Sequence, residues 1–211
     1  MSKDAKTPKD KDTKDAIPLG TSLLGPIMNL GESVTNANNW RTEQLYLENL
    51  QKCVCYFEPR ELNERYIPYI FNRMTKGMAE IKQSAQEHLV SFLYDNHITS
   101  ITNSIMKKLQ QEFQASTNYL KRLTFLELYE RLARKFSRTF FKTYNLNDLA
   151  LALGNDKLIC VKKKFVSIGI LLRTMVFDED SQMITKVEEG INKVCFVKDK
   201  EVARVLFHTS Q

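Results

Sequence analysis

The chain has 211 residues, of which 43% are hydrophobic and 27% charged, so it can bury a core of ordinary size. With only 7 Gly and 5 Pro beside many Leu, Lys, Glu and Gln residues, the composition favours helices over sheets. The formal net charge of +6 favours acidic over basic partners, and no run approaches the roughly 18–20 apolar residues of a membrane span.

Residues 1–17 alternate lysine and aspartate and carry almost no apolar side chain. Such a segment cannot bury enough apolar surface to offset the entropy lost on ordering, so we expect a disordered charged tail. Residues 18–211 are expected to form one helical domain.

The first helical pair of this domain is predicted over residues 18–57. Its first helix, over residues 18–32, contains three glycines and is expected to be kinked or shortened by Pro26. Its second helix spans residues 40–57, and Asn39 is a suitable N-cap for it.

The second pair, over residues 60–96, is the clearest in the chain. Two apolar stripes with helical spacing flank Gly77, which can end a helix without a Cβ penalty. Pro68 falls inside the first of these helices and is expected to bend it.

Three further pairs follow. The third is predicted over residues 99–137, and the fourth has a long second helix over residues 161–176. The fifth begins near residue 178, and its short second helix covers residues 200–208.

The apolar positions repeat with a period of about 40 residues. Ile81 is followed by Leu120 after 39 residues, by Val161 after a further 41, and by Val202 after 41 more. Such a period is typical of stacked helical hairpins. We therefore predict an all-α fold, an α-solenoid of about five antiparallel helix pairs preceded by a disordered N-terminal tail.

Two motifs carry a resemblance to a known family. The sequence NNWR at residues 38–41 and the sequence PRELNERYIPYIFNRM at residues 59–74 resemble HEAT repeats in the scaffold and regulatory subunits of Ser/Thr protein phosphatases 2A and 4. In that family a Trp-Arg pair opens a second helix and a Tyr-x-Pro step lies in the next first helix. Residues 122–164 are also similar to the family's pattern, and the resemblance extends over residues 19–209.

This resemblance implies HEAT-like pairs in an armadillo-type superhelix. It also implies a non-catalytic scaffold for protein–protein interaction, a regulatory or scaffold subunit that holds a Ser/Thr phosphatase catalytic subunit. Because family members contain many more repeats, it suggests that the chain is a short or partial relative.

The residues themselves show no catalytic pattern. Gly-rich phosphate loops, Gly-x-Ser-x-Gly, His-Glu-x-x-His and kinase motifs are all missing from the sequence. His88 lies on the apolar stripe of its helix, which predicts a core residue rather than a base. The four cysteines and three histidines have no zinc-site spacing. We expect no enzymatic activity, no cofactor and no metal.

A protein-binding ridge is the predicted functional site. In a stack of hairpins the turns within each hairpin align along one edge, and Trp, Tyr and Arg are enriched at the energetic centres of interfaces. Alternatively, Trp40 fills the seam between the first two hairpins, and the repeat-equivalent lysines pair with carboxylates of neighbouring repeats. The predicted ridge residues are Trp40, Arg41, Met78, Lys82, Tyr119, Lys121, Lys157 and Lys162.

A second hypothesis is a basic helical-repeat adaptor that binds nucleic acid or another acidic partner. It rests on the net charge, on residues 162–164 and on a basic run in the third and fourth pairs. Because a solvated basic surface explains the same charges, nucleic acid is the less favoured partner. A third hypothesis is an adaptor that binds a partner helix on its concave face. The basic run comprises Arg131, Arg134, Lys135, Arg138 and Lys142.

The cellular compartment follows from weaker signals. The first 15 residues lack the apolar centre of a secretory signal, and most cysteines have apolar neighbours. We expect reduced thiols and a cytoplasmic location, with the nucleus as an alternative and no membrane partner.

Overall fold

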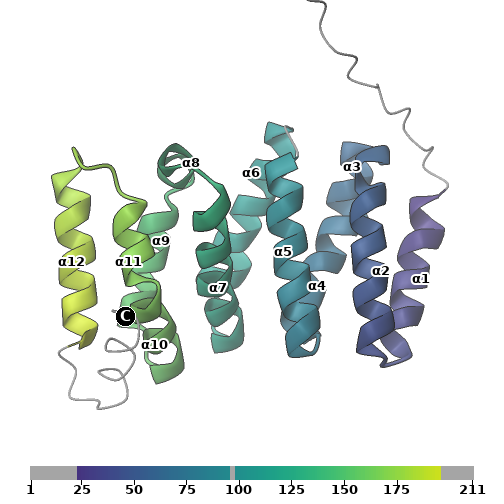
Figure 1. Cartoon of the computed structure of the whole chain (residues 1–211), viewed down its shortest axis with the longest axis horizontal. Coiled ribbons are helices and arrows are strands. Elements are labelled where there is room, and N and C mark those ends of the chain that lie inside the picture. Colours follow the sequence, from purple (N-terminus) through teal and green to yellow (C-terminus); the bar gives the residue numbers. More distant parts are fainter. Residues whose placement is uncertain (1–22, 96–97, 196–211) are drawn as a thin grey trace, which may run out of the picture.

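The computed structural model describes residues 23–95 and 98–195, and every regular element in them is a helix. Successive hairpins stand side by side in a row, with the first helices in one layer and the second helices in another (Figure 1). This arrangement confirms the α-solenoid. The predicted tail and the second helix of the fifth pair lie outside the described residues.

The first two hairpins follow the predicted boundaries closely. The first is formed by α1 (Leu24–Asn36) and α2 (Trp40–Cys53), with the 3₁₀ turn η1 (Val54–Tyr56) after it. The second is formed by α3 (Pro59–Glu61), the π-helical turn η2 (Leu62–Tyr66), α4 (Ile67–Lys76) and the antiparallel α5 (Ala79–Asp95).

The later hairpins contain shorter pieces. The third is formed by α6 (Thr99–Lys108), the π-helical turn η3 (Leu109–Gln114) and α7 (Tyr119–Lys135). The fourth is formed by α8 (Arg138–Thr143), α9 (Leu146–Ala152), the 3₁₀ turn η4 (Leu153–Asn155), α10 (Ile159–Ser167) and α11 (Gly169–Thr174). The described part ends with α12 (Ser181–Cys195).

The two prolines in first helices are accommodated locally. Pro26 is the third residue of α1. Backbone N–H groups in the first turn of a helix have no intrahelical acceptor, so the missing N–H of a proline removes no hydrogen bond there. The helix continues to Asn36 instead of ending near residue 32. Pro68 follows the π turn, in which the Ile67 N–H donates to the Leu62 carbonyl five residues earlier. The wider turn leaves room for the proline ring, and the helix continues to Lys76.

The second helix predicted for the fourth pair is broken at Ile168, which separates α10 from α11. Gly169 follows directly and occupies the position equivalent to Leu89 and Leu128. A Cβ at Gly169 would lie 3.1 Å from Ile191 Cδ1 of α12, so the glycine permits close packing of α12.

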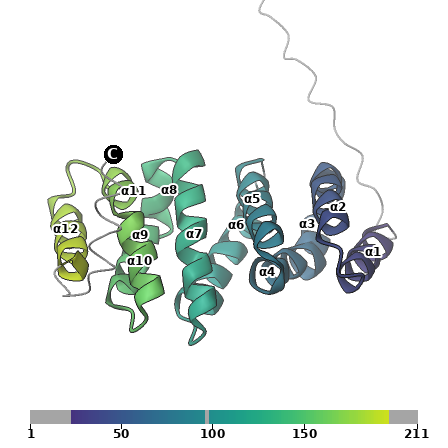
Figure 2. The same cartoon turned by 60° about the horizontal axis from the view of Figure 1, so that its bottom comes forward.

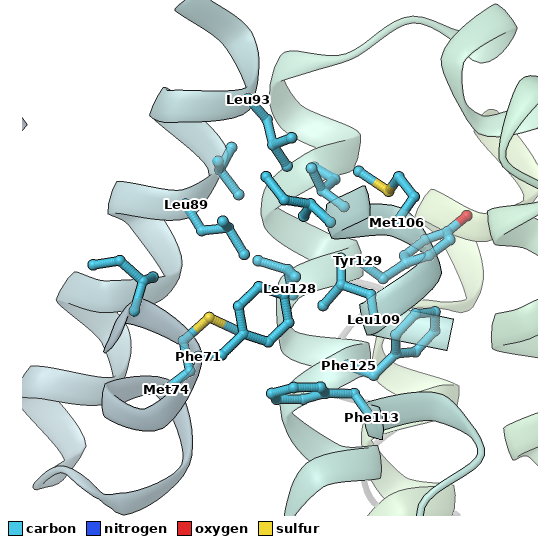
Figure 3. Close-up of a cluster of buried hydrophobic side chains, with 14 of the residues drawn as sticks. Phe71, Met74, Leu89, Leu93, Met106, Leu109, Phe113, Phe125, Leu128 and Tyr129 are labelled. Carbon is cyan, nitrogen blue, oxygen red and sulfur yellow. The ribbon is translucent and has the colours of Figure 1, made fainter. Parts of the chain in front are cut away.

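Apolar side chains fill the seams between hairpins. Figure 3 shows residues from the second hairpin and the third hairpin meeting in one cluster. Within it the rings of Phe71 and Phe113 meet edge to face with centroids 5.1 Å apart. Leu89 and Leu128 are both fully buried, which confirms the 39-residue register.

A buried ion pair joins the first two hairpins. The Arg73 guanidinium of α4 lies 3.0 Å from the Glu43 carboxylate of α2, and the Thr35 hydroxyl of α1 donates to the same oxygen. Removing one member of such a pair leaves a buried charge, at a cost of about 3–5 kcal/mol, so this contact sets the position of α2 against α4.

His88 is buried as predicted, and its Nδ1 lies 3.1 Å from the Tyr66 hydroxyl. Burial disfavours the imidazolium and lowers the pKa of His88 from 6.5 to about 4. The imidazole is therefore neutral near pH 7, as a core position requires.

His88 should make folding stability depend on pH. Between pH 6.5 and pH 4 the unfolded chain protonates this histidine while the folded chain does not, so acidification favours unfolding. We expect the free energy of unfolding to fall by up to about 1.4 kcal/mol per pH unit in this window. Urea titrations of the wild type and His88→Phe at several pH values would measure the slope. An equally steep slope in the variant would contradict the assignment.

Two leucines of α7 should differ sharply in their importance for stability. Leu128 is fully buried, whereas Leu120 is 40% exposed. We expect Leu128→Ala to cost about 2–5 kcal/mol and Leu120→Ala under about 1 kcal/mol, because only the first leaves a cavity in the seam. Chemical denaturation of both variants tests this expectation, and equal losses would argue against the described register of α7.

Candidate protein-binding surface

The turns within the hairpins lie along one edge of the stack, as predicted. Figure 2 brings this edge forward, with the α4–α5 turn and the start of α7 visible on it. Short polar side chains begin the second helices: Asn39 accepts hydrogen bonds from two backbone N–H groups of α2, and Asn118 accepts one from Leu120. Asp156 accepts a hydrogen bond from the Leu158 N–H in the fourth turn.

Exposed apolar side chains recur at successive turns. Each lies at the start of a second helix and is between 37% and 49% exposed. We call this set, together with Trp40 and Arg41 of the first turn, the turn ridge. The exposed apolar members are Met78, Tyr119, Leu120, Leu158 and Ile159.

The eight predicted site residues do not all belong to this surface. Arg41 is exposed, and its guanidinium stacks over the half-buried ring of Trp40 at 4.6 Å. Trp40 also packs against the core, as the alternative interpretation of this residue expects, while its role in binding a partner stays a prediction. Met78 and Tyr119 are exposed on the ridge, and Lys157 is exposed in the fourth turn.

The other three predicted lysines are half-buried and stand further along their helices. The Lys121 ammonium lies 5.5 Å from the centre of the Phe113 ring, and the charge of Lys162 acts on Asp156. Among the described residues, neither these two nor Lys82 lies within 4 Å of a carboxylate oxygen, so the pairing of these lysines with carboxylates of neighbouring repeats is not formed.

The pairing expected of Lys121 is made by its neighbour Arg122. The Arg122 guanidinium donates to both carboxylate oxygens of Asp156 and to the carbonyls of Ser116 and Thr117. One side chain thus ties the third turn to the fourth. A bidentate, charge-assisted contact of this kind fixes both distance and orientation.

The electrostatics of Asp156 reflect this contact. Burial alone would raise the pKa of its carboxyl. The hydrogen bonds from Arg122 and from the Leu158 N–H, with the charges of Arg122 and Lys162, outweigh burial and hold the pKa below its usual range. Asp156 is therefore ionised at neutral pH and can keep the two turns together.

Four of the five residues in the basic run of the second hypothesis have polar partners in the chain, three of them in a neighbouring hairpin. Arg131 faces Glu87 at 3.8 Å, and Lys135 donates to the Ser91 hydroxyl at 2.9 Å. Arg134 pairs with Glu130 of its own helix, while Arg138 reaches Asp178 at 3.2 Å. These partners account for the basic residues without a nucleic acid.

Three exposed apolar residues were not singled out as contact residues from the sequence. Leu120, Leu158 and Ile159 lie in the turn segments predicted to form the ridge, residues 118–121 and 154–161, but Leu120 was also placed on the apolar stripe of its helix and none of the three was named as a site residue. The available signal was a pair of adjacent apolar residues just after Asn118 and after Asp156, because two neighbours on a helix cannot both face the same core.

Residues 23–95 and 98–195 contain neither a candidate metal site nor a candidate membrane-spanning helix. No group of three or more His, Cys, Asp or Glu side chains in this part could hold a metal ion. Of the helices described, none has the length and apolar character needed to cross a lipid bilayer.

Asp156→Asn should loosen the link between the third and fourth turns. Loss of the charge-assisted contact is expected to cost about 1.5–3 kcal/mol at pH 7. Because the folded pKa of Asp156 is depressed, its contribution is present above the unfolded pKa and disappears as the pH falls below about 4. The variant and wild type should therefore converge in urea titrations at low pH. Glu179→Gln, at an exposed position, is the control; an equal loss in both variants would refute the clamp.

Comparison with known proteins gives distant similarities. No protein family model matches the chain. Over 173 residues, 81% of the chain, it is 24% identical to human serine/threonine-protein phosphatase 4 regulatory subunit 4, and 23% identical to the mouse protein of that name. The chain spans about a fifth of the length of these relatives. The similarity supports a helical-repeat relationship to a regulatory, non-catalytic subunit.

Proposed function

We propose that the chain is a non-catalytic protein-binding scaffold that uses the turn ridge, and that it acts as a regulatory or scaffold subunit of a Ser/Thr protein phosphatase complex. One observation carries the proposal: apolar side chains are exposed at successive turns along one edge. Exposed apolar groups aligned in this way are typical of a surface that a protein partner covers.

The chemistry of the ridge suits a large partner. Arg41 at the first turn and Lys157 at the fourth stand towards the two ends of its row of apolar side chains, so a partner would bury apolar surface and meet a cation near each end. Each turn contributes a few contacts, and affinity accumulates over several turns. We therefore expect the loss of one residue to weaken binding gradually.

The phosphatase part of the proposal rests on the two relatives, which are named as regulatory subunits of phosphatase 4. By that similarity the partner would be a Ser/Thr phosphatase catalytic subunit. The cytoplasmic location of the complex is a separate proposal, which rests on the sequence alone. Affinity capture of the tagged chain from its native cells, read by mass spectrometry, tests this. Recovery of a phosphatase catalytic subunit would support the proposal, and recovery of only chaperones or ribosomal proteins would count against it.

The ridge itself is tested by Trp40→Ala combined with Tyr119→Ala. Truncation of an aromatic anchor typically costs about 1–2 kcal/mol, so with additive effects we expect the double variant to bind the captured partner about thirtyfold to eight-hundredfold more weakly. Circular dichroism should show unchanged helicity. Leu30→Ala with Leu45→Ala is the control, because both leucines are exposed on helices away from the turns. Unaltered binding in the Trp40 and Tyr119 variant would refute the ridge assignment.

A further inference from the structure

The second-helix layer has three successive seams, and polar contacts bridge two of them. Between α5 and α7, Arg131 faces Glu87 and Lys135 donates to Ser91. Between α7 and α10, Lys164 pairs with Glu130. In both seams a cation from one helix meets a carboxylate or hydroxyl of the next.

The seam between α2 and α5 differs. No hydrogen bond or ion pair between the described residues joins these two helices, and a groove of about 540 Å³ lies there. Carboxylates stand on both sides of it, Glu48 on α2 and Glu80 and Glu87 on α5, and the remaining lining is neutral. The groove thus lacks the cations that occupy the neighbouring seams.

Two of these three carboxylates, Glu48 and Glu80, have no cationic partner among the described residues. Glu48 accepts a hydrogen bond from the neutral amide of Gln44, and Glu87 accepts one from Gln83 at 3.1 Å. Arg131 approaches Glu87 from the α7 side, at 3.8 Å. Glu80 is exposed at the rim. The local charge is therefore negative, although the whole chain carries a formal charge of +6.

A buried polar atom in the same groove provides an independent observation. His88 lines the groove and is 3% exposed, and its Nε2 has no hydrogen-bond partner within residues 23–95 and 98–195. The neutral imidazole uses Nδ1 with Tyr66, so Nε2 remains a single unused donor or acceptor, whichever tautomer is present. An unmade hydrogen bond at a buried atom costs free energy. A peptide backbone, which carries both N–H and C=O groups, could satisfy either tautomer.

From these observations we propose that the α2–α5 groove binds an extended segment of a protein partner that carries Lys or Arg side chains. Glu80 and Glu87 are separated by seven residues of helix, about 10 Å along the axis. In an extended peptide of polyproline II conformation, with three residues per turn and about 3.1 Å per residue, side chains three residues apart project to the same side at about the same spacing. Basic residues at positions i and i+3 would therefore reach both carboxylates, and an acidic segment would be repelled.

The test uses Trp40, the single tryptophan of the chain, which lines one end of the groove. A capped peptide of three arginines separated by Gly-Ser pairs is titrated into the full chain at low salt while tryptophan fluorescence is recorded. We expect a saturable change that weakens with added salt. The same peptide with three glutamates in place of the arginines should produce none.

The carboxylates are tested by Glu48→Gln, Glu80→Gln and Glu87→Gln in one chain. Each solvent-exposed ion pair contributes about twofold to affinity, so the triple variant should bind the arginine peptide about tenfold more weakly. Glu80→Gln alone should reduce binding about twofold, and it keeps the test informative if the triple variant folds poorly. The control triple is Glu32→Gln, Glu188→Gln and Glu189→Gln, all exposed and outside the groove.

The proposal would be overturned by the lack of a saturable response to the arginine peptide, or by equal weakening in the groove variant and the control. Equal binding of the glutamate peptide would also overturn it. The proposal does not depend on the phosphatase assignment, because the groove and the turn ridge share only Trp40.

Discussion

The rest of the structure depends on the apolar seam between neighbouring hairpins. Within a hairpin, each of the two antiparallel helices covers one apolar face of the other. The apolar faces that remain must be covered by the next hairpin. The meeting of Phe71 with Phe113 and the burial of Leu128 show this requirement at the centre of the stack. Local features serve the same seam: the π turn before Pro68 lets a first helix continue, and Gly169 admits α12 at close range. Stability is therefore shared between hairpins and belongs to none of them alone.

The position of the turn ridge follows from that packing. Once the seams set the register of the second helices, their first residues line up along one edge (Figure 1). The apolar side chains there, such as Met78 and Tyr119, remain exposed because no further hairpin lies beyond the turns. The contact of Arg122 with Asp156 adds a second constraint, since it fixes one turn directly to the next. The ridge is thus a consequence of the core and is held rigid by it, which reduces the entropy that a partner must overcome.

The two surfaces of the molecule have opposite chemistry. The turn ridge exposes apolar side chains with cations among them, and the α2–α5 groove presents carboxylates around a buried imidazole. Trp40 belongs to both, at the end of the groove where α2 begins. A partner that covered the first turn would therefore lie next to the groove. This difference in charge over a short distance would favour one orientation of a partner over others.

The sequence by itself determined the helical period, the 39-residue register of Leu89 and Leu128, the buried role of His88 and the edge on which the turns align. These are properties of local spacing, which a helix converts directly into a face. Only the tertiary structure decided that Leu120 is exposed and that Arg122 rather than Lys121 meets Asp156. It also decided that Arg131, Lys135 and Arg138 have partners in neighbouring hairpins. Side chains 34 to 44 residues apart in the chain form these contacts, and their distances depend on how hairpins pack. Periodicity assigns a residue to a face, but it cannot show which neighbour that face will meet.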